Sequence, residues 1–167
     1  MMNSTEHLLQ KIKDKELFIV TVESITGGAI INELTNIPGF SDVIYGGIVV
    51  YNVIAKNELL SKVTHDVYSH SFVHKMCLDA LDKYSGTLAI AISGNSDNTK
   101  TSKIDGENAS FEYWLCFGCH EQFKNIYVIE KNDEIDNIYD KIERRITIND
   151  IIVSNIIKEL HLYLDSI

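Results

Sequence analysis

The stretch ELFIVTVESITGG at residues 16–28 decides the fold of this chain. Its first part, residues 16–22, is mostly apolar and rich in β-branched side chains, which is typical of a strand buried on both faces by helices. We expect the strand to end at Glu23 and Ser24. A pair of glycines follows, and residues 29–34 then have helical periodicity, which Asn36 and the Pro38-Gly39 pair stop. The order strand, turn, helix predicts an α/β unit.

The same alternation continues outward from this unit. Before it, residues 5–13 form an amphipathic pattern behind Ser4 and Thr5, which are candidate helix caps. After it, apolar runs predict strands at 43–51, 87–92, 113–118 and 125–130, and helical spacing predicts helices at 53–61, 69–83, 135–142 and 148–164. Residues 95–108 are polar and aperiodic, which indicates a loop. Strands interleaved with helices predict a single three-layer α/β/α domain over residues 1–167, with a mixed, largely buried β-sheet.

Composition limits the classes of function. The chain has 167 residues, of which 45% are hydrophobic, and a formal net charge of −9. This charge repels phosphates, so we expect neither nucleic acid nor an anionic membrane as a partner, and local cations must meet any anionic substrate. Charged residues interrupt residues 1–14, and no run approaches the roughly 20 apolar residues of a membrane span. Three cysteines without an export signal predict reduced thiols and a cytoplasmic location.

Ser24 is the strongest candidate for chemistry. A serine at the end of a buried strand, directly before a helix, projects its hydroxyl at the sheet edge where α/β proteins bind ligands. The glycines that follow allow close backbone approach, and the free N–H groups of a helix start can hold a phosphate or an oxyanion. The alternative is an ordinary turn in which Ser24 or Thr26 caps the helix.

Tyr51 and Lys56 follow the second predicted strand and complete a usable hydrolytic set with Ser24. A lysine amine can act as a base toward serine, and a tyrosine hydroxyl can relay the proton or donate to the tetrahedral intermediate. A free lysine is almost fully protonated near pH 7, so folding must lower its pKa. Burial or the charge of Arg145 would lower it, whereas the carboxylate of Glu23 would raise it. The alternative is that Tyr51 packs and Lys56 is solvated.

Two of the glycines and two pairs of other residues also stand out. Gly46 and Gly47 lie inside the second predicted strand and predict a bulge or a close backbone approach. The segment CFGCH at 116–120 has the letters of a c-type haem site, but it lies in an apolar strand, so Cys116 and Cys119 are predicted to be packed cysteines. His70 and His74 are four residues apart on a predicted helix without an evident third ligand, which favours exposed histidines over a metal site.

Five segments resemble the CinA C-terminal domain family, the nicotinamide-mononucleotide deamidases. Residues 22–28 (VESITGG) are similar to the family's AESCTGG, and residues 37–41 (IPGFS) to its Pro-Gly-x-Ser turn. Residues 47–56 are similar to its Gly-x-x-x-Tyr-x-x-x-x-Lys stretch, and residues 91–94 to its strand ending in Thr/Ser-Gly. Arg145 falls where the family has the arginine of a Gly-Asp-Arg turn before the last helix. All five segments keep the family's order.

The resemblance implies hydrolysis of the carboxamide of nicotinamide mononucleotide (NMN) to nicotinate mononucleotide and ammonia, in pyridine nucleotide salvage. It implies no metal and no cofactor, and a homo-oligomer. Ser24 would attack, with Lys56 and Tyr51 as its activators. Arg145 and Ser41 would contact the substrate. Thr26, Gly27 and Gly28, in the turn that opens the helix, would cradle its phosphate. Ser93 would line the amide end of the pocket.

The chain departs from the family pattern around the pocket rim. Ile25 replaces the usual cysteine, residues 95–101 (NSDNTKT) replace Ile-Ala-Gly-Pro and glycine-rich sequence, Phe111-Glu112 replaces a Gly-Thr pair, and Glu143-Arg144 replaces Gly-Asp. An altered rim changes which ligand fits. A second hypothesis therefore stays open, in which the chain is a nucleotide-binding or oligomeric partner-binding module of the same fold without turnover.

Overall fold

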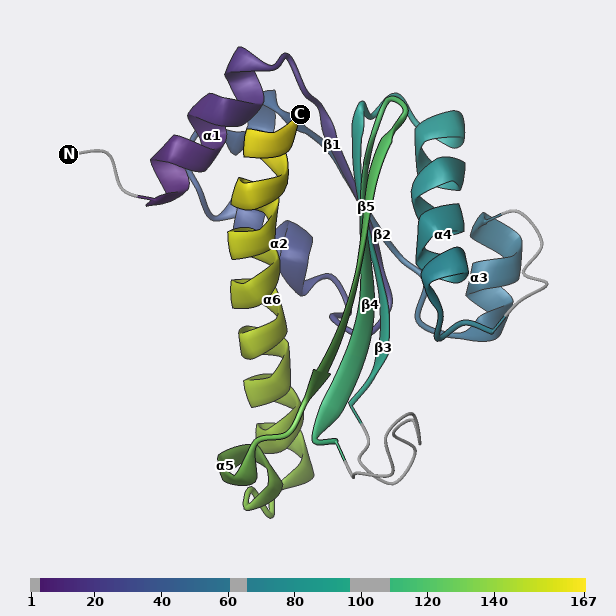
Figure 1. Ribbon diagram of the computed structural model, residues 1–167, viewed down its shortest axis with the longest axis vertical. Helices are drawn as coiled ribbons and strands as arrows, with labels where there is room; N and C mark the ends of the chain where they lie inside the picture. Colours follow the sequence, from purple (N-terminus) through teal and green to yellow (C-terminus); the bar gives the residue numbers. More distant parts are fainter. Residues whose placement is uncertain (1–3, 61–65, 97–108) are drawn as a thin grey trace.

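The computed structural model describes residues 4–60, 66–96 and 109–167. Its centre is a five-stranded sheet in the order β2-β1-β3-β4-β5, between two layers of helices (Figure 1). Strand β1 is parallel to β2 and β3, whereas β4 is antiparallel to β3 and β5. The sheet is therefore mixed, and the predicted α/β class is confirmed. The strands are β1 (Ile19–Glu23), β2 (Ile44–Val49), β3 (Leu88–Asn95), β4 (Phe111–Cys119) and β5 (Gln122–Glu130).

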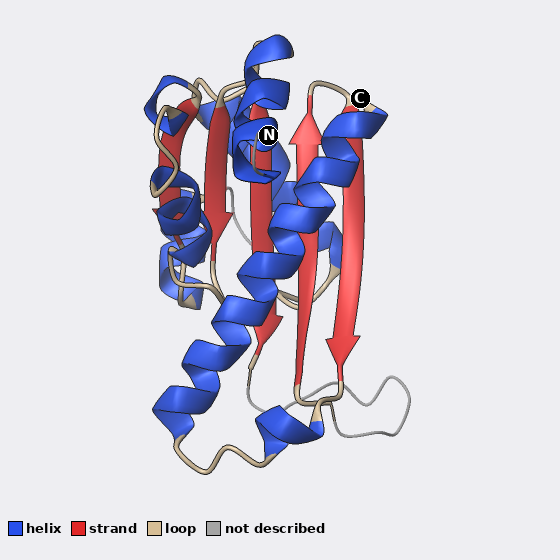
Figure 2. Ribbon diagram, turned by 90° about the vertical axis from the view of Figure 1, so that its left-hand side faces the viewer, coloured by secondary structure: helices blue, strands red, loops and turns tan. Residues whose placement is uncertain are grey.

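Helices cover both faces of the sheet. Figure 1 shows α1, α2 and α6 on one face and α3 and α4 on the other, and Figure 2 shows α6 running along the sheet for most of its length. In the described ranges, no helix combines the length and apolar character that a membrane span requires. The helices are α1 (Ser4–Asp14), α2 (Ala29–Thr35), α3 (Val53–Leu59), α4 (His70–Lys83), α5 (Asp133–Asp136) and α6 (Lys141–Ser166), with a 3₁₀ turn, η1, at Phe40–Asp42.

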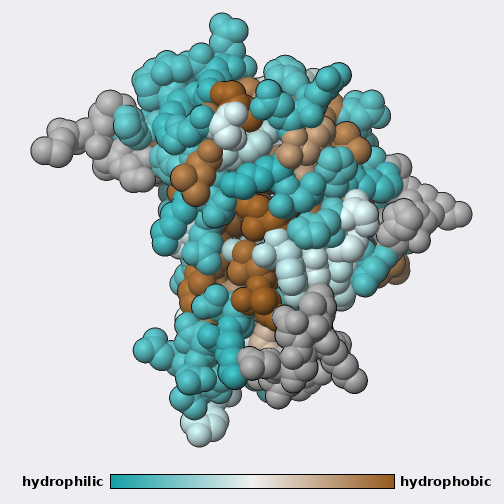
Figure 3. Space-filling model, in the orientation of Figure 1, coloured by the Kyte–Doolittle hydropathy of each residue, from teal (hydrophilic) through white to brown (hydrophobic). Residues whose placement is uncertain are grey.

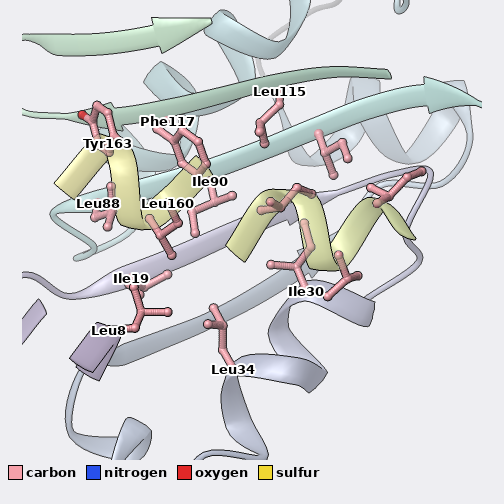
Figure 4. Close-up of a cluster of buried hydrophobic side chains, with 14 of the residues drawn as sticks. Leu8, Ile19, Ile30, Leu34, Leu88, Ile90, Leu115, Phe117, Leu160 and Tyr163 are labelled. Atoms are coloured by element: carbon pink, nitrogen blue, oxygen red, sulfur yellow. The ribbon is translucent and has the colours of Figure 1, made fainter. Parts of the chain in front are cut away.

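Each face of the sheet has its own apolar core, because successive residues of a strand point to opposite faces. The first core lies under α1, α2 and α6 and includes Ile19, Ile90 and Leu160 (Figure 4). The second lies under α4 and includes Val20 and Met76. All of β1 is buried, as its apolar run predicts. In Figure 3, hydrophilic residues cover much of the surface, and a hydrophobic band lies between α6 and the sheet.

Gly46 and Gly47 show both predicted features. The pairing of β1 with β2 shifts by one residue at Tyr45, which is a bulge. A Cβ atom on Gly47 would lie 2.6 Å from Thr21 Oγ1 and 2.9 Å from the Ile31 side chain. The absence of a side chain at Gly47 therefore lets α2 pack closely against the sheet.

The helix boundaries near the C-terminal end correct the prediction. The prediction of a helix over residues 135–142 is wrong, because α5 ends at Asp136 and residues 137–140 are not helical. The last helix begins at Lys141 rather than at Ile148, because the Asp140 side chain accepts hydrogen bonds from the backbone N–H groups two and three residues later, at 2.9 and 2.8 Å. Arg145 consequently lies within α6 and not in a turn before it.

The loop predicted at 95–108 begins later than expected, because β3 includes Asn95. Asn95 pairs with Glu112 at the end of β3, so the strand extends beyond its apolar run. Residues 97–108 lie outside the described residues. At the other end of β4, Cys116 and Cys119 are buried free thiols, which confirms the prediction of packed cysteines. Burial raises the pKa of the Cys119 thiol.

Candidate functional site

The parallel strands bring the predicted hydrolytic set to one edge of the sheet. β1, β2 and β3 run in the same direction, so Ser24, Tyr51 and Asn95 all stand where a strand ends. A pocket of about 200 Å³ opens at this edge. Its lining comes from five parts of the chain: Ser24, Ile25, Tyr51, Lys56, Tyr68, Gly94, Asn95, Ser96 and Arg145.

Ser24 and Lys56 form a buried pair. The Lys56 Nζ atom donates a hydrogen bond to Ser24 Oγ at 3.0 Å, and the two residues are only 4% and 6% exposed. Asn52 caps α3 by accepting a hydrogen bond from the Ala55 N–H at 2.8 Å, which begins the short helix that carries Lys56 inward. Burial lowers the pKa of Lys56, because an ammonium loses hydration in the protein. The two atoms are therefore within the distance that a nucleophile and its base require, and burial shifts the pKa of the amine in the direction that a base requires.

Tyr51 and Arg145 form a second pair on the pocket wall. The Arg145 Nη1 atom donates to the Tyr51 hydroxyl at 3.0 Å, a contact between residues 94 positions apart. Tyr51 is 58% exposed, so its hydroxyl remains accessible to a ligand. The long helix α6 brings Arg145 to this edge, which places a cation at the mouth of a pocket in a chain of net charge −9.

Glu23 takes the position that a bound phosphate was expected to occupy. Its fully buried carboxylate accepts hydrogen bonds from Thr26 Oγ1 at 2.7 Å and from the N–H groups of Gly28, Ile30 and Ile31 at 3.0, 3.1 and 2.9 Å. The start of α2 thus has an internal anion already. This geometry does not support the phosphate cradle predicted for the turn that opens α2.

The remaining members of the turn fit the same description. The Gly27 N–H donates to the Ser24 carbonyl at 3.1 Å, so it closes the turn after β1. Thr26, Gly27 and Gly28 are not among the residues that line the pocket. Sequence reasoning missed the role of Glu23. The sequence did contain a signal for this role: Glu23 precedes a predicted helix whose first turn has no acidic residue of its own, so Glu23 is the nearest anion for the N–H groups at that helix start.

Ser41 and Ser93 do not contact the pocket in the manner predicted. Ser41 is exposed on η1 and is not among the pocket residues. Ser93 is buried in β3, where its hydroxyl donates to the Val67 carbonyl at 2.7 Å. Ser93 therefore holds the segment before α4, which carries the pocket residue Tyr68. The sequence offered no signal that Tyr68 belongs to the site, because this residue lies in the segment between the predicted helices at 53–61 and 69–83, and that segment has no recognisable motif.

A neighbouring pocket extends the site toward α6. Its volume is about 350 Å³, and it shares Ser96 and Arg145 with the first pocket. Lys141 also lines it and adds a second exposed cation. Arg144 is already bound, because it donates to the carbonyls of Ser96 and Ser110 at 2.7 and 2.8 Å. Arg145 and Lys141 are thus the cations of this surface that best suit an anionic ligand.

The two predicted histidines lie away from this edge. His70 is exposed, as predicted, whereas His74 is half-buried with its ring 4.5 Å from that of Phe123. The His74 Nδ1 atom is 3.2 Å from the Asn125 side-chain nitrogen. Across the described ranges, no group of three or more His, Cys, Asp or Glu residues is placed to hold a metal ion.

The fold and the site together define an α/β protein with a buried serine-lysine pair at the carboxyl edge of its parallel strands. The sequence model of the CinA C-terminal domain matches residues 2–109. The chain belongs to the CinA C-terminal domain family. The matched residues include Ser24, Tyr51 and Lys56 but not Arg145, whose assignment depends on its contact with Tyr51.

Curated relatives support the family over the same region. A CinA-like protein of Chloroherpeton thalassium is 37% identical over 94 residues, which are 53% of this chain and 22% of that protein. Protein MG115 of Mycoplasma genitalium is 30% identical over 92 residues, which are 52% of this chain and 59% of that protein. The match therefore spans about a fifth of the first relative and less than two thirds of the second.

Solved structures agree with the fold over almost the whole chain. A competence or damage-inducible protein from Enterobacter asburiae has a TM-score of 0.72 at 20% identity, covering 94% of this chain and 96% of that one. The competence/damage inducible protein CihA from Agrobacterium tumefaciens has a TM-score of 0.70 at 21% identity, covering 99% of this chain and 96% of that one. At these identities the likeness establishes the fold alone.

Proposed function

We propose that this chain hydrolyses the carboxamide of NMN to nicotinate mononucleotide and ammonia, with Ser24 as the nucleophile. One observation carries the proposal: the 3.0 Å contact between Lys56 Nζ and Ser24 Oγ in a buried setting that lowers the pKa of the lysine. Serine is a weak nucleophile at its ordinary pKa and needs an adjacent base. The neutral form of the Lys56 amine, at this distance, supplies one, and burial shifts its pKa in the direction that favours this form.

The chemistry follows from this pair. The Ser24 hydroxyl gives its proton to the neutral amine of Lys56 while Oγ forms a bond to the carboxamide carbon. The tetrahedral intermediate collapses, the C–N bond breaks, and Lys56 returns the proton to the departing ammonia. Water then attacks the acyl ester with Lys56 as base, and the C–Oγ bond breaks to release the nicotinate product and restore Ser24. No step requires a metal or an organic cofactor.

Tyr51 and Arg145 are proposed to bind rather than to relay protons. Tyr51 contacts Arg145 at 3.0 Å, which favours a role as hydrogen-bond donor to the substrate or to the intermediate over a role in the proton path of Lys56. The guanidinium of Arg145, with Lys141 near it, suits the phosphate of the nucleotide. This assignment replaces the α2 turn as the phosphate site.

The test is ammonia release from NMN by the purified protein, with Ser24→Ala and the matched control Ser41→Ala. Ser24→Ala should lower turnover at least 10²-fold, which corresponds to about 2.7 kcal/mol of transition-state stabilisation. Ser41 is exposed and outside the pocket, so its variant should keep normal turnover. Unchanged turnover in Ser24→Ala would remove the nucleophile assignment. Binding of NMN without ammonia release by the wild type would instead support the second hypothesis, a nucleotide-binding module without turnover.

The homo-oligomer implied by the resemblance stays a prediction, and light scattering of the purified protein tests it.

A further inference from the structure

A layer of aromatic rings lies behind one lining residue of the Ser24 pocket, Tyr68. Tyr68 lines the pocket and is 43% exposed, and its ring centroid is 6.0 Å from that of Trp114. Trp114 is 6% exposed and stacks on Tyr127 at 4.7 Å with an interplanar angle of 21°. Three aromatic rings thus form a continuous layer from the sheet to the pocket, and Tyr68 is the ring that a ligand can reach.

A buried carboxylate stands behind this layer. Glu112 is 3% exposed and accepts a hydrogen bond from the Tyr127 hydroxyl at 2.8 Å. It pairs across β3 and β4 with Asn95, which itself lines the pocket. Glu112 is also one of the residues that depart from the family pattern at the rim. The layer therefore combines aromatic faces with a buried acidic residue.

The position of Tyr68 is set by its backbone. The Tyr68 N–H donates to Asp66 Oδ1 at 2.9 Å, and the carbonyl of the residue before it accepts the Ser93 hydroxyl at 2.7 Å. Directly after it, the Ser69 side chain caps α4 by accepting the Phe72 N–H at 3.2 Å. These contacts hold Tyr68 in place before a ligand arrives, which reduces the ordering cost of binding.

We propose that Tyr68, backed by Trp114, Tyr127 and Glu112, is a specificity-determining residue that receives a positively charged heteroaromatic ring. Aromatic faces attract cations through their quadrupole, and a carboxylate behind them adds to the attraction. The inference rests on the proposed function, because a ring on Tyr68 would present its carboxamide to Ser24 in the same pocket. The site then meets the two charges of the substrate separately, the phosphate at Arg145 and the ring cation at Tyr68.

The experiment compares two ligands that differ in ring charge. NMN has a cationic pyridinium ring, whereas its reduced 1,4-dihydro form has the same amide, ribose and phosphate on a neutral ring. Both are titrated calorimetrically into Ser24→Ala protein, in which turnover is blocked. A second readout is the fluorescence of Trp114, the single tryptophan of the chain, which a ring on Tyr68 should change.

Tyr68→Leu should weaken binding of oxidised NMN about three- to thirtyfold, the range of a cation–π contact, and binding of the reduced form less than twofold. Tyr68→Phe keeps the ring and should bind both forms nearly as the parent does. Glu112→Gln keeps the shape of the carboxylate and should lower the preference for the oxidised form, which provides a second variant if Tyr68→Leu does not fold.

Equal weakening of both forms by Tyr68→Leu, or no weakening, would overturn the proposal. Failure of oxidised NMN to bind the Ser24→Ala protein would overturn it as well. The proposed hydrolysis fails separately: if the wild type releases no ammonia while the preference for the cationic ring depends on Tyr68, the ring site stands without the amidase reaction.

Discussion

Replacement of Lys56 tests the base assignment most directly. Lys56→Met keeps the apolar stem and removes the amine, and Lys56→Arg keeps a cation that cannot lose its proton near neutral pH. The amine is 3.0 Å from Ser24 Oγ, within reach for general-base catalysis, which commonly contributes 10²–10⁴-fold. Both variants should therefore lose about 2.7–5.4 kcal/mol of transition-state stabilisation, measured as ammonia release from NMN.

The pH dependence supplies an independent readout of the same residue. Only the neutral amine accepts the Ser24 proton, so kcat/KM should rise about tenfold per pH unit and level off above the pKa of Lys56. Burial lowers that pKa from the ordinary value of 10.5, so the plateau should begin below pH 10.5. Each unit of lowering leaves about ten times more neutral amine near pH 7. A pH-rate profile of the wild type measures this directly.

Stability should follow the same ionisation. Between the lowered pKa of folded Lys56 and 10.5, the unfolded chain binds more protons than the folded protein, so the unfolding free energy of the wild type should rise with pH. Lys56→Met lacks this group, so urea titrations should show the wild type gaining stability relative to the variant as pH rises through that window.

Two results would refute the reasoning about Lys56. If Lys56→Arg keeps most of its turnover, Lys56 contributes only positive charge, and the Ser24 proton leaves by another route, such as Tyr51. If kcat/KM of the wild type is flat across the alkaline range while the protein stays folded, the neutral amine is not the reacting form.

Two further variants test the other groups of the site. Arg145→Ala should raise the KM for NMN about 10- to 150-fold, the range of a hydrogen bond to a charged group, and should change the KM of the dephosphorylated nucleoside little. An equal effect on both substrates would separate Arg145 from the phosphate. Glu23→Gln should lower the unfolding free energy by about 2–4 kcal/mol in urea titration, because a neutral amide replaces the carboxylate that accepts the Thr26 hydroxyl and the N–H groups at the start of α2. A loss below about 0.5 kcal/mol would mean that α2 does not depend on this charge.

Local patterns were sufficient for most of the fold. The apolar run before Glu23 predicts β1 because a strand between two helical layers has no polar face, and Gly47 predicts the close approach that the packing of α2 requires. Periodicity was insufficient between 133 and 148. Apolar spacing there fits a helix on either side of Asp140, and the side-chain cap that starts α6 at Lys141 depends on backbone geometry rather than on the apolar pattern.

The sequence by itself determined that Ser24 follows a buried strand and precedes a helix, since both elements are local. Only the tertiary structure decided its partners. Parallel pairing of β1 and β2 brings Lys56 across 32 residues to 3.0 Å from Ser24, and α6 brings Arg145 across 94 residues to Tyr51. The tertiary structure also decided that the N–H groups at the start of α2 bind Glu23. A buried carboxylate needs hydrogen-bond donors, and the first N–H groups of a helix have no partner within the helix.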